Sequence, residues 1–208
     1  QLPAEFLGQV ASEVPTVTVT RSDISVAGMD TVSNDDVAGA GLAVDHLVSL
    51  GHTRITHLDG GDNPVSHLRA QGYREAMARH GLKSHTTQVS GGLSDQAGYV
   101  AAKKALGSSP TALFVANDFS AMGAIAAVEE AGLDVPGDIS IIGYDGISLG
   151  GLRSVNLTSV AQPLAELGRL AATRLLERIE TPGGKAHHDH VASEVIVRGT
   201  TGPAPAHP

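Results

Sequence analysis

Three side chains with complementary hydrogen-bonding capacity, Arg69, Asn117 and Asp145, each follow a different β-rich run of the sequence. Arg69 supplies a forked planar donor, Asn117 a donor and an acceptor, and Asp145 only acceptors. Together these groups suit a small ligand dense in hydroxyls or heteroatoms, and none of them needs to be a catalyst. A simpler interpretation stays open, in which Asn117 caps the following helix and Asp145 begins a turn.

A second pattern could perform nucleophilic catalysis. Residues 146–150 read Gly-Ile-Ser-Leu-Gly, the G-x-S-x-G spacing of a nucleophile elbow around Ser148, and Asp189 and His190 follow in the order found in hydrolases. An elbow requires a strand that runs directly into the serine and a helix that leaves it. The predicted strand ends near Gly143, and two glycines follow Ser148 closely, so the pattern disfavours a serine hydrolase.

Residues 187–190 read His-His-Asp-His and carry the side-chain types of a metal site. Neighbouring residues of a loop point in different directions, and no second cluster at helical spacing supports them. A solvated loop is the favoured interpretation, and the sequence predicts neither a metal ion nor a cofactor.

Composition excludes several classes of protein. The 208 residues include no cysteine, so disulfides, thiolate nucleophiles and iron–sulfur clusters are ruled out. Lys and Arg number 14 against 22 Asp and Glu, for a net charge of −8, so another segment must contact any DNA that is involved. No run of 18 uncharged apolar residues is present, which excludes a transmembrane helix.

Short β-rich runs alternate with stretches of helical period, which predicts an α/β fold with parallel strands joined by helices. The predicted strands cover residues 16–20, 54–58, 86–89, 111–116, 139–143, 157–161 and 191–197. The predicted helices cover residues 35–50, 65–80, 94–106, 119–131 and 164–180. Residues 181–190 are expected to form a polar loop, and residues 202–208 a frayed tail. Ligands of such folds bind outside the carboxyl ends of the strands, where the three polar side chains named above fall.

Six short strings of residues occur in the order and spacing of the lactose-repressor/galactose-repressor (LacI/GalR) family, which this chain resembles up to about Thr201. They are Asp35-Asp36-Val-Ala-Gly39, Leu50-Gly51-His52-x-Arg54-Ile55, Ser66-x-x-Arg69-x-x-Gly72-Tyr73, Ala116-Asn117-Asp118, Gly143-Tyr144-Asp145 and Thr158-x-Val160-x-Gln162-Pro163. Each string is weak alone, but six in register are specific for the family's effector-binding region.

The resemblance implies a periplasmic-binding-protein-like fold of two flavodoxin-like, parallel-sheet subdomains with the ligand in the cleft between them. Residues 1–34 and 162–185 are expected to form an incomplete N-terminal subdomain. Residues 35–161 and 191–201 are expected to form the C-terminal subdomain, with 202–208 as the tail. The family's DNA-binding headpiece is expected to precede residue 1.

The ligand contacts that the resemblance implies are Arg69, Asn117 and Asp145, with Ser66 and Gln162 as helpers. Leu93 stands where sugar- and purine-binding members often place an aromatic ring. Thr20 replaces a common Asp, and Asp36 a common Asn, on the opposite lip of the cleft. Replacing Arg69 by Ala is expected to leave folding largely intact and to cost roughly 2 to 4 kcal/mol of ligand binding.

By the same resemblance, the chain is the effector-binding and dimerisation region of a cytoplasmic bacterial transcriptional regulator. It would bind a sugar or related metabolite, perform no chemistry, form a homodimer and reach operator DNA through the headpiece, without contacting a membrane. Ligand binding would bias the arrangement of the subdomains and thereby DNA binding. A periplasmic solute-binding protein of a transporter is the main alternative, and a serine hydrolase that uses Ser148 is the second.

Overall fold

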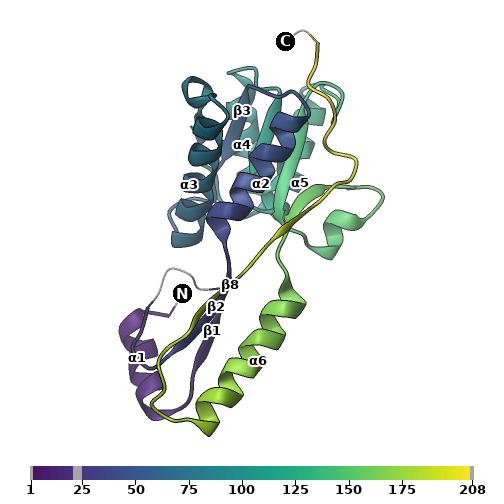
Figure 1. Cartoon of the computed structure of the whole chain (residues 1–208). Coiled ribbons are helices and arrows are strands. Elements are labelled where there is room, and N and C mark those ends of the chain that lie inside the picture. The colour runs from purple at the N-terminus through teal and green to yellow at the C-terminus, as the bar shows by residue number, and fades with distance from the viewer. Residues whose placement is uncertain (1, 21–24, 207–208) are drawn as a thin grey trace. The chain divides into compact units, whose positions relative to one another are not determined.

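The computed structural model describes residues 2–20 and 25–206, and these residues form two compact units. One unit comprises Gln1–Asp35 and Pro163–Ser193, and the other comprises Asp36–Gln162 and Glu194–Pro208 (Figure 1). The division differs from the expected boundaries, because Asp35 and residues 186–193 belong to the first unit and Gln162 belongs to the second.

The first unit contains a three-stranded parallel sheet in the order β1-β2-β8. Its elements are α1 (Ala4–Glu13), β1 (Val17–Val19), β2 (Asp30–Asn34), α6 (Leu164–Glu180) and β8 (His188–Val191). Helix α6 packs against β1 and β2. The sequence predicted α6 and β1, but not α1 or β2.

Strand β2 was not predicted because most of its residues are polar, in the sequence Asp-Thr-Val-Ser-Asn. All five are nevertheless buried. Buried polar groups need partners, and here they have them. Asp30 accepts two hydrogen bonds from the guanidinium of Arg178 on α6, at 2.8 and 2.5 Å. The prediction of a loop over residues 181–190 is wrong in its second half, because β8 forms there. The Nδ1 atom of His188 forms a hydrogen bond with the hydroxyl of Thr31, and that of His190 with the hydroxyl of Ser33.

The second unit contains a six-stranded sheet in the order β4-β3-β5-β6-β7-β9, in which only β9 is antiparallel, pairing with β7. The elements are α2 (Asp36–Ser49), β3 (Ile55–Leu58), α3 (Pro64–Arg79), β4 (Thr87–Val89), α4 (Asp95–Leu106), β5 (Ala112–Val115), α5 (Asp118–Glu130), β6 (Ser140–Asp145), β7 (Thr158–Ala161) and β9 (Glu194–Ile196), with short 3-10 turns η1 (Lys83–His85) and η2 (Ser148–Gly151). The first five strands have the flavodoxin-like order 2-1-3-4-5.

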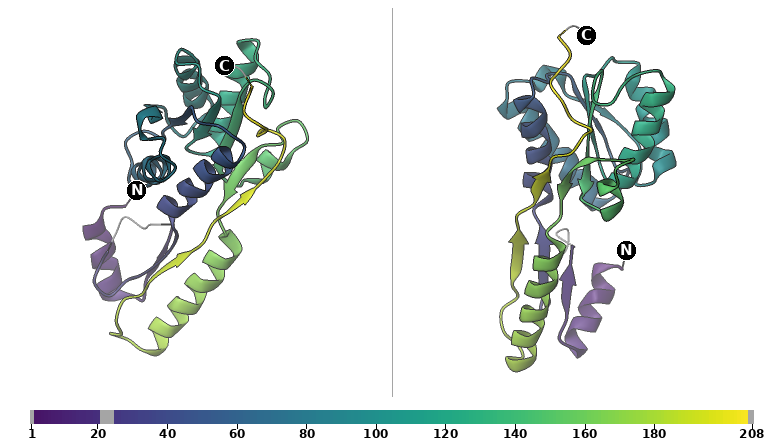
Figure 2. Two further views of the ribbon diagram at one scale, coloured as in Figure 1. Left: turned by 45° about the horizontal axis from the view of Figure 1, so that its top comes forward. Right: turned by 90° about the vertical axis from the view of Figure 1, so that its right-hand side faces the viewer.

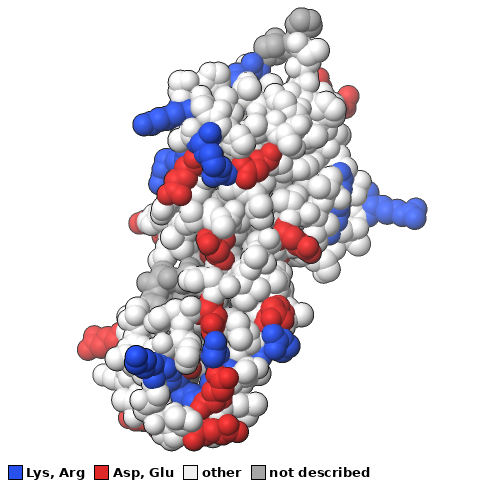
Figure 3. All heavy atoms as spheres, viewed as in Figure 1, with Lys and Arg blue, Asp and Glu red and all other residues white. Residues whose placement is uncertain are grey.

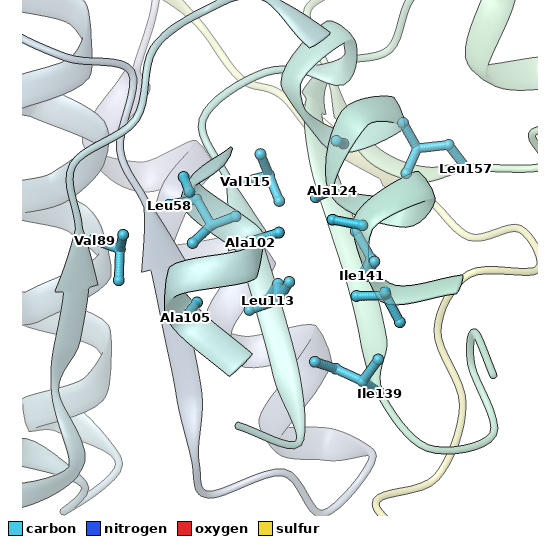
Figure 4. Packing of buried hydrophobic residues seen from close by; sticks show 14 residues of the cluster. Leu58, Val89, Ala102, Ala105, Leu113, Val115, Ala124, Ile139, Ile141 and Leu157 are labelled. Carbon is cyan, nitrogen blue, oxygen red and sulfur yellow. The ribbon is translucent and has the colours of Figure 1, made fainter. Parts of the chain in front are cut away.

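The sheet of the second unit is covered on both faces, by α2 and α3 on one side and by α4 and α5 on the other (Figure 2). Strand β5 shows how apolar side chains are provided to both faces of the sheet. Its side chains alternate, so that Leu113 and Val115 join the cluster under α4 and α5, which Figure 4 shows, while Phe114 packs under α2 and α3. A strand that is buried on both faces reads as a continuous apolar run, and residues 112–115 do.

Helix ends in the second unit follow local sequence signals. The side chains of Asn63, Ser94 and Asn117 accept hydrogen bonds from the backbone N–H three residues later, and thereby cap α3, α4 and α5. Gly51 adopts φ +91° just beyond α2, a conformation that a side chain would strain. These caps fix the loops at both edges of the sheet.

Residues 202–204 do not fray as expected, because they pack onto the second unit. The N–H of Gly202 donates to Ser140 Oγ at 3.0 Å, and that of Ala204 donates to the carbonyl of Leu50 at 2.8 Å. The Nε2 atom of the buried His52 imidazole lies 3.0 Å from Ser140 Oγ and 3.1 Å from the carbonyl oxygen of Gly202. Residues 207–208 of the predicted tail lie outside the described part of the chain.

Acidic and basic side chains are interspersed on the face shown in Figure 3, without a broad basic field there. This distribution agrees with the net charge of −8. Among the described residues, no helix is both long enough and apolar enough to cross a membrane.

Candidate ligand-binding site

The predicted polar side chains of the second unit gather at the carboxyl ends of its strands. Strands β4 and β5 lie on opposite sides of β3, so the chain order reverses at β3. Open α/β sheets bind ligands outside this switch point, where the loops after neighbouring strands leave in opposite directions. Residues 59–63 leave β3 here, and residues 116 and 117 leave β5.

Arg69 lies at the centre of this edge and is only 5% exposed. It sits on the second turn of α3, which begins at Pro64 after the Asn63 cap. Its Nε donates to Asp36 Oδ1 at 2.9 Å, its Nη1 to the carbonyl of Ala116 at 2.5 Å, and its Nη2 lies 3.1 Å from Asp145 Oδ1. One guanidinium therefore joins α2, α3, β5 and β6.

The aromatic ring of Tyr144 supports the guanidinium of Arg69 from one side. The Cζ of Arg69 lies 3.6 Å from the ring centroid, within the range of a cation–π contact. Tyr144 is fully buried, and its hydroxyl approaches Gly39 of α2 so closely that a Cβ at that position would overlap it. Gly39 thus leaves the space in which the ring sits beneath Arg69.

Asp145 ends β6 and carries the second charge of the site. Its φ of +104° is unusual for a residue with a side chain and marks strain at this junction. Its Oδ1 accepts a hydrogen bond from Gln162 Nε2 at 2.7 Å. Burial raises the pKa of Asp145, and the neighbouring Arg69 and Gln162 oppose that rise.

Burial alone would lower the pKa of Arg69, but Asp145 and Asp36 raise it above its usual value. Arg69 is therefore a permanent cation that two carboxylates share. Such a group can donate to hydroxyl oxygens, while Asp145 beside it can accept from hydroxyl hydrogens.

Asn117 caps α5 as the simpler interpretation predicted, and it also binds the neighbouring loop. Its Oδ1 accepts from the N–H of Ser120 at 2.9 Å, and its Nδ2 donates to the carbonyl of Leu93 at 3.0 Å. Asn117 is 7% exposed and follows Ala116, whose carbonyl binds Arg69. Its amide therefore holds the loop after β4 against the end of β5.

Ser66 and Leu93 lie close together around Gly60. A Cβ on Gly60 would overlap Ser66 Oγ and the Cδ2 of Leu93. Ser66 Oγ accepts a hydrogen bond from Asn63 Nδ2 at 2.7 Å, whereas the Leu93 side chain is 47% exposed. The structure thus brings Arg69, Asp145 and Gln162 into direct contact and places Asn117, Ser66 and Leu93 in the adjoining loops. Thr20 belongs to the first unit, whereas Asp36, which was expected on the same lip as Thr20, belongs to the second unit and binds Arg69.

Asp118 organises the same edge, although it is not among the ligand contacts that the resemblance implied. It is fully buried, and it accepts hydrogen bonds from Ser159 Oγ at 2.6 Å and from the N–H of Ile147 at 2.8 Å. Burial raises the pKa of Asp118 to about 6. The Ala116-Asn117-Asp118 string could have pointed to Asp118, but helix capping was enough to explain a polar residue at this position.

The nucleophile-elbow geometry is not formed around Ser148. Strand β6 ends at Asp145, and exposed Ser148 begins the 3-10 turn Ser148–Gly151 rather than joining a strand to an α-helix. Downstream, Asp189 pairs with Arg174 through two hydrogen bonds at 2.6 and 3.0 Å. Across residues 2–20 and 25–206, no group of three or more His, Cys, Asp or Glu is placed to hold a metal ion.

Comparison with known proteins agrees with this architecture. The profile of a family described as periplasmic binding protein-like domain matches residues 44–201. The ribose operon repressor of Escherichia coli K12 is 36% identical over 184 residues, which cover 86% of this chain and 56% of the repressor. The chain therefore spans a little more than half the length of that relative.

Two solved structures are similar to this one. A LacI transcriptional regulator from a Rhodococcus species superimposes with a TM-score of 0.93 at 37% identity, over 98% of this chain and 76% of that one. A LacI family regulator from Enterococcus faecium, solved with bound ribose, gives a TM-score of 0.82 at 32% identity, over 92% and 71% of the two chains. The chain belongs to the periplasmic binding protein-like domain family, in the form that LacI/GalR transcriptional regulators carry.

Proposed function

We propose that this chain is the effector-binding region of a bacterial transcriptional regulator and that it binds a sugar-like ligand at the carboxyl edge of the six-stranded sheet. The single observation that carries this proposal is the contact of Arg69 with Asp145. A guanidinium and a carboxylate side by side present donors and acceptors at adjacent points. Adjacent hydroxyls of a sugar both donate and accept, so they match such a pair.

D-ribose is the first ligand to test. One solved relative contains bound ribose, and another relative is named as a ribose operon repressor. Leu93 offers an apolar contact but no aromatic ring for stacking at its position in the loop after β4. The ligand is therefore held chiefly by hydrogen bonds, and its affinity depends on the polar residues around Arg69.

The whole protein is proposed to be a cytoplasmic homodimer that contacts operator DNA through a region outside this sequence. The relatives named above are a repressor and two regulators, which supports this role over that of a transporter's solute-binding protein. The net charge of −8 agrees with DNA contact through another segment. Ligand and DNA binding are then linked by a coupling free energy of about 1 to 3 kcal/mol.

Isothermal titration of D-ribose, with other sugars, polyols and nucleobases as a panel, tests the proposal. Gln162→Ala removes a side chain that contacts Asp145 without removing a buried charge, and it should weaken binding about tenfold. Gln71→Ala is the matched control, because Gln71 is exposed on α3 and bonds only to Glu75 among the contacts described for its side chain. Equal affinity in the two variants, or no binding by any member of the panel, would refute the assignment.

A further inference from the structure

A cavity lies at the opposite, amino-terminal edge of the six-stranded sheet. It has a volume of about 310 Å3, at the lower end of the range for small-molecule sites. Leu106 at the end of α4, Leu133 after α5 and Ile139 before β6 form much of its apolar wall. Arg54 and Asp138 also line this cavity.

A smaller cavity of about 110 Å3 adjoins the first, and the two share Arg54 and Pro110. Its remaining lining residues are Thr56, His85, Thr87 and Ser108, so it presents hydroxyls and an imidazole. No carboxylate is among the described residues that line it. The small cavity therefore favours an anion, whereas the large one favours an apolar chain.

Arg54 lies in the wall common to both cavities, directly before β3. Its Nε donates to the carbonyl of Ser109 at 3.0 Å, which holds the guanidinium in place. That bond uses one of the five N–H donors of the side chain. Arg54 belongs to the string at residues 50–55 that the proposed effector site does not use.

We propose that these adjoining cavities bind an aliphatic carboxylate, with its head group on Arg54 and its hydrocarbon chain against Leu106, Leu133 and Ile139. Charge complementarity selects the head group, because an arginine fork matches the two oxygens of a carboxylate. Apolar walls select the chain. The site is independent of the proposed effector site, since it lies at the other edge of the sheet.

Titration of the full chain with butanoate, hexanoate and octanoate tests the apolar half of the site. Each added methylene should tighten binding roughly fourfold until the larger cavity is filled. Octylamine has the same chain with the opposite charge and should bind at least tenfold more weakly than octanoate. Affinities that do not depend on chain length, or equal binding of the amine, would overturn the proposal.

Variants at the two halves of the site test its location. Arg54→Gln should weaken octanoate binding at least tenfold, and Arg153→Gln, at an exposed arginine of the same unit, should leave it unchanged. Ala131→Trp fills the larger cavity from an exposed position at the end of α5 and should abolish the dependence on chain length. Asp138→Asn removes the carboxylate of that cavity and should tighten octanoate binding.

Thermal unfolding of each variant shows whether it is folded. If Arg54→Gln does not fold, Ala131→Trp alone decides the question. Octanoate binding that persists unchanged in a folded Ala131→Trp variant places the ligand elsewhere and refutes the site. Competition by D-ribose would also refute it, because the two ligands would then share the opposite edge of the sheet.

Discussion

The guanidinium of Arg69 lies 3.1 Å from the carboxylate of Asp145 and so joins α3 to the end of β6. The same group binds Asp36 at 2.9 Å, where both side chains are less than a tenth exposed. Arg69 thus neutralises two carboxylates where water has little access, so it stabilises the folded structure and is also a candidate ligand contact. This pairing changes what a substitution of Arg69 is expected to do.

Arg69→Ala should lower the free energy of unfolding by about 3 to 5 kcal/mol, because it leaves Asp36 buried without its cation. The sequence alone predicts that Arg69→Ala leaves folding largely intact, and the buried pair of Arg69 with Asp36 revises that expectation. Arg79→Ala is the control, since the pair of Arg79 with Asp45 is about half exposed and is worth about 0.2 to 1 kcal/mol. Urea denaturation of the two variants measures the difference, and equal losses would show that the burial of Arg69 has no energetic consequence.

Asp118 should make stability depend on pH. Its pKa of about 6 in the folded protein lies above its ordinary value of 3.8, so the folded state binds more protons than the unfolded state between these values. The contribution of Asp118 to the free energy of unfolding therefore falls as pH rises from about 4 to about 6, by up to about 3 kcal/mol.

Asp118→Asn should remove this slope, because the amide does not titrate. Denaturation of the wild-type and Asp118→Asn proteins at several pH values gives the free energy of unfolding of each. The difference between the two values isolates the contribution of Asp118, because most other groups contribute equally to both. Asp145, whose pKa is also raised by burial, contributes with the same sign and remains in the variant. Parallel pH profiles for the two proteins would contradict the raised pKa of Asp118.

Arg178→Ala should destabilise the first unit by about 3 to 5 kcal/mol. Arg178 supplies two hydrogen bonds to Asp30, which is 1% exposed and also accepts the N–H of His187 at 2.7 Å. Glu166→Ala breaks an ion pair with Arg169 that is about half exposed, on the same helix, and should cost less than about 1 kcal/mol. Calorimetric melting of both variants gives the comparison, and a loss below 1 kcal/mol for Arg178→Ala would contradict the argument.

Two glycines on helices should respond oppositely to alanine. A Cβ at Gly123 of α5 would overlap the backbone of α4 at Asp95, so Gly123→Ala should cost at least about 1 to 3 kcal/mol. Apart from the neighbouring backbone of α6 itself, no atom lies within 4 Å of a Cβ built at Gly168, so Gly168→Ala should stabilise by about 0.5 to 1 kcal/mol. Melting temperatures of the two variants should move in opposite directions. A Gly123→Ala protein that melts at or above the wild-type temperature would show that α4 and α5 separate without cost.

Strands and helices of the second unit could be predicted because local signals there agree with the tertiary structure. The apolar run at 112–115, the caps at Asn63, Ser94 and Asn117 and the glycine at 51 each act within a few residues of one another. In the first unit the sequence predicted α6 and β1, but the signals for β2 and β8 were weaker. Strand β2 is stabilised by pairing with β1 and β8 and by the bond of Asp30 to Arg178, which lies 148 residues away in sequence.

By itself, the sequence determined the α/β class, the family and the edge of the sheet at which polar side chains collect, because these depend on residue types at short spacings. Only the tertiary structure decided that Arg69 is shared by Asp36 and Asp145, that Asn117 holds the loop at Leu93, and that residues 202–204 pack rather than fray. The physical reason is that such pairings depend on burial and on distances between residues that are far apart along the chain.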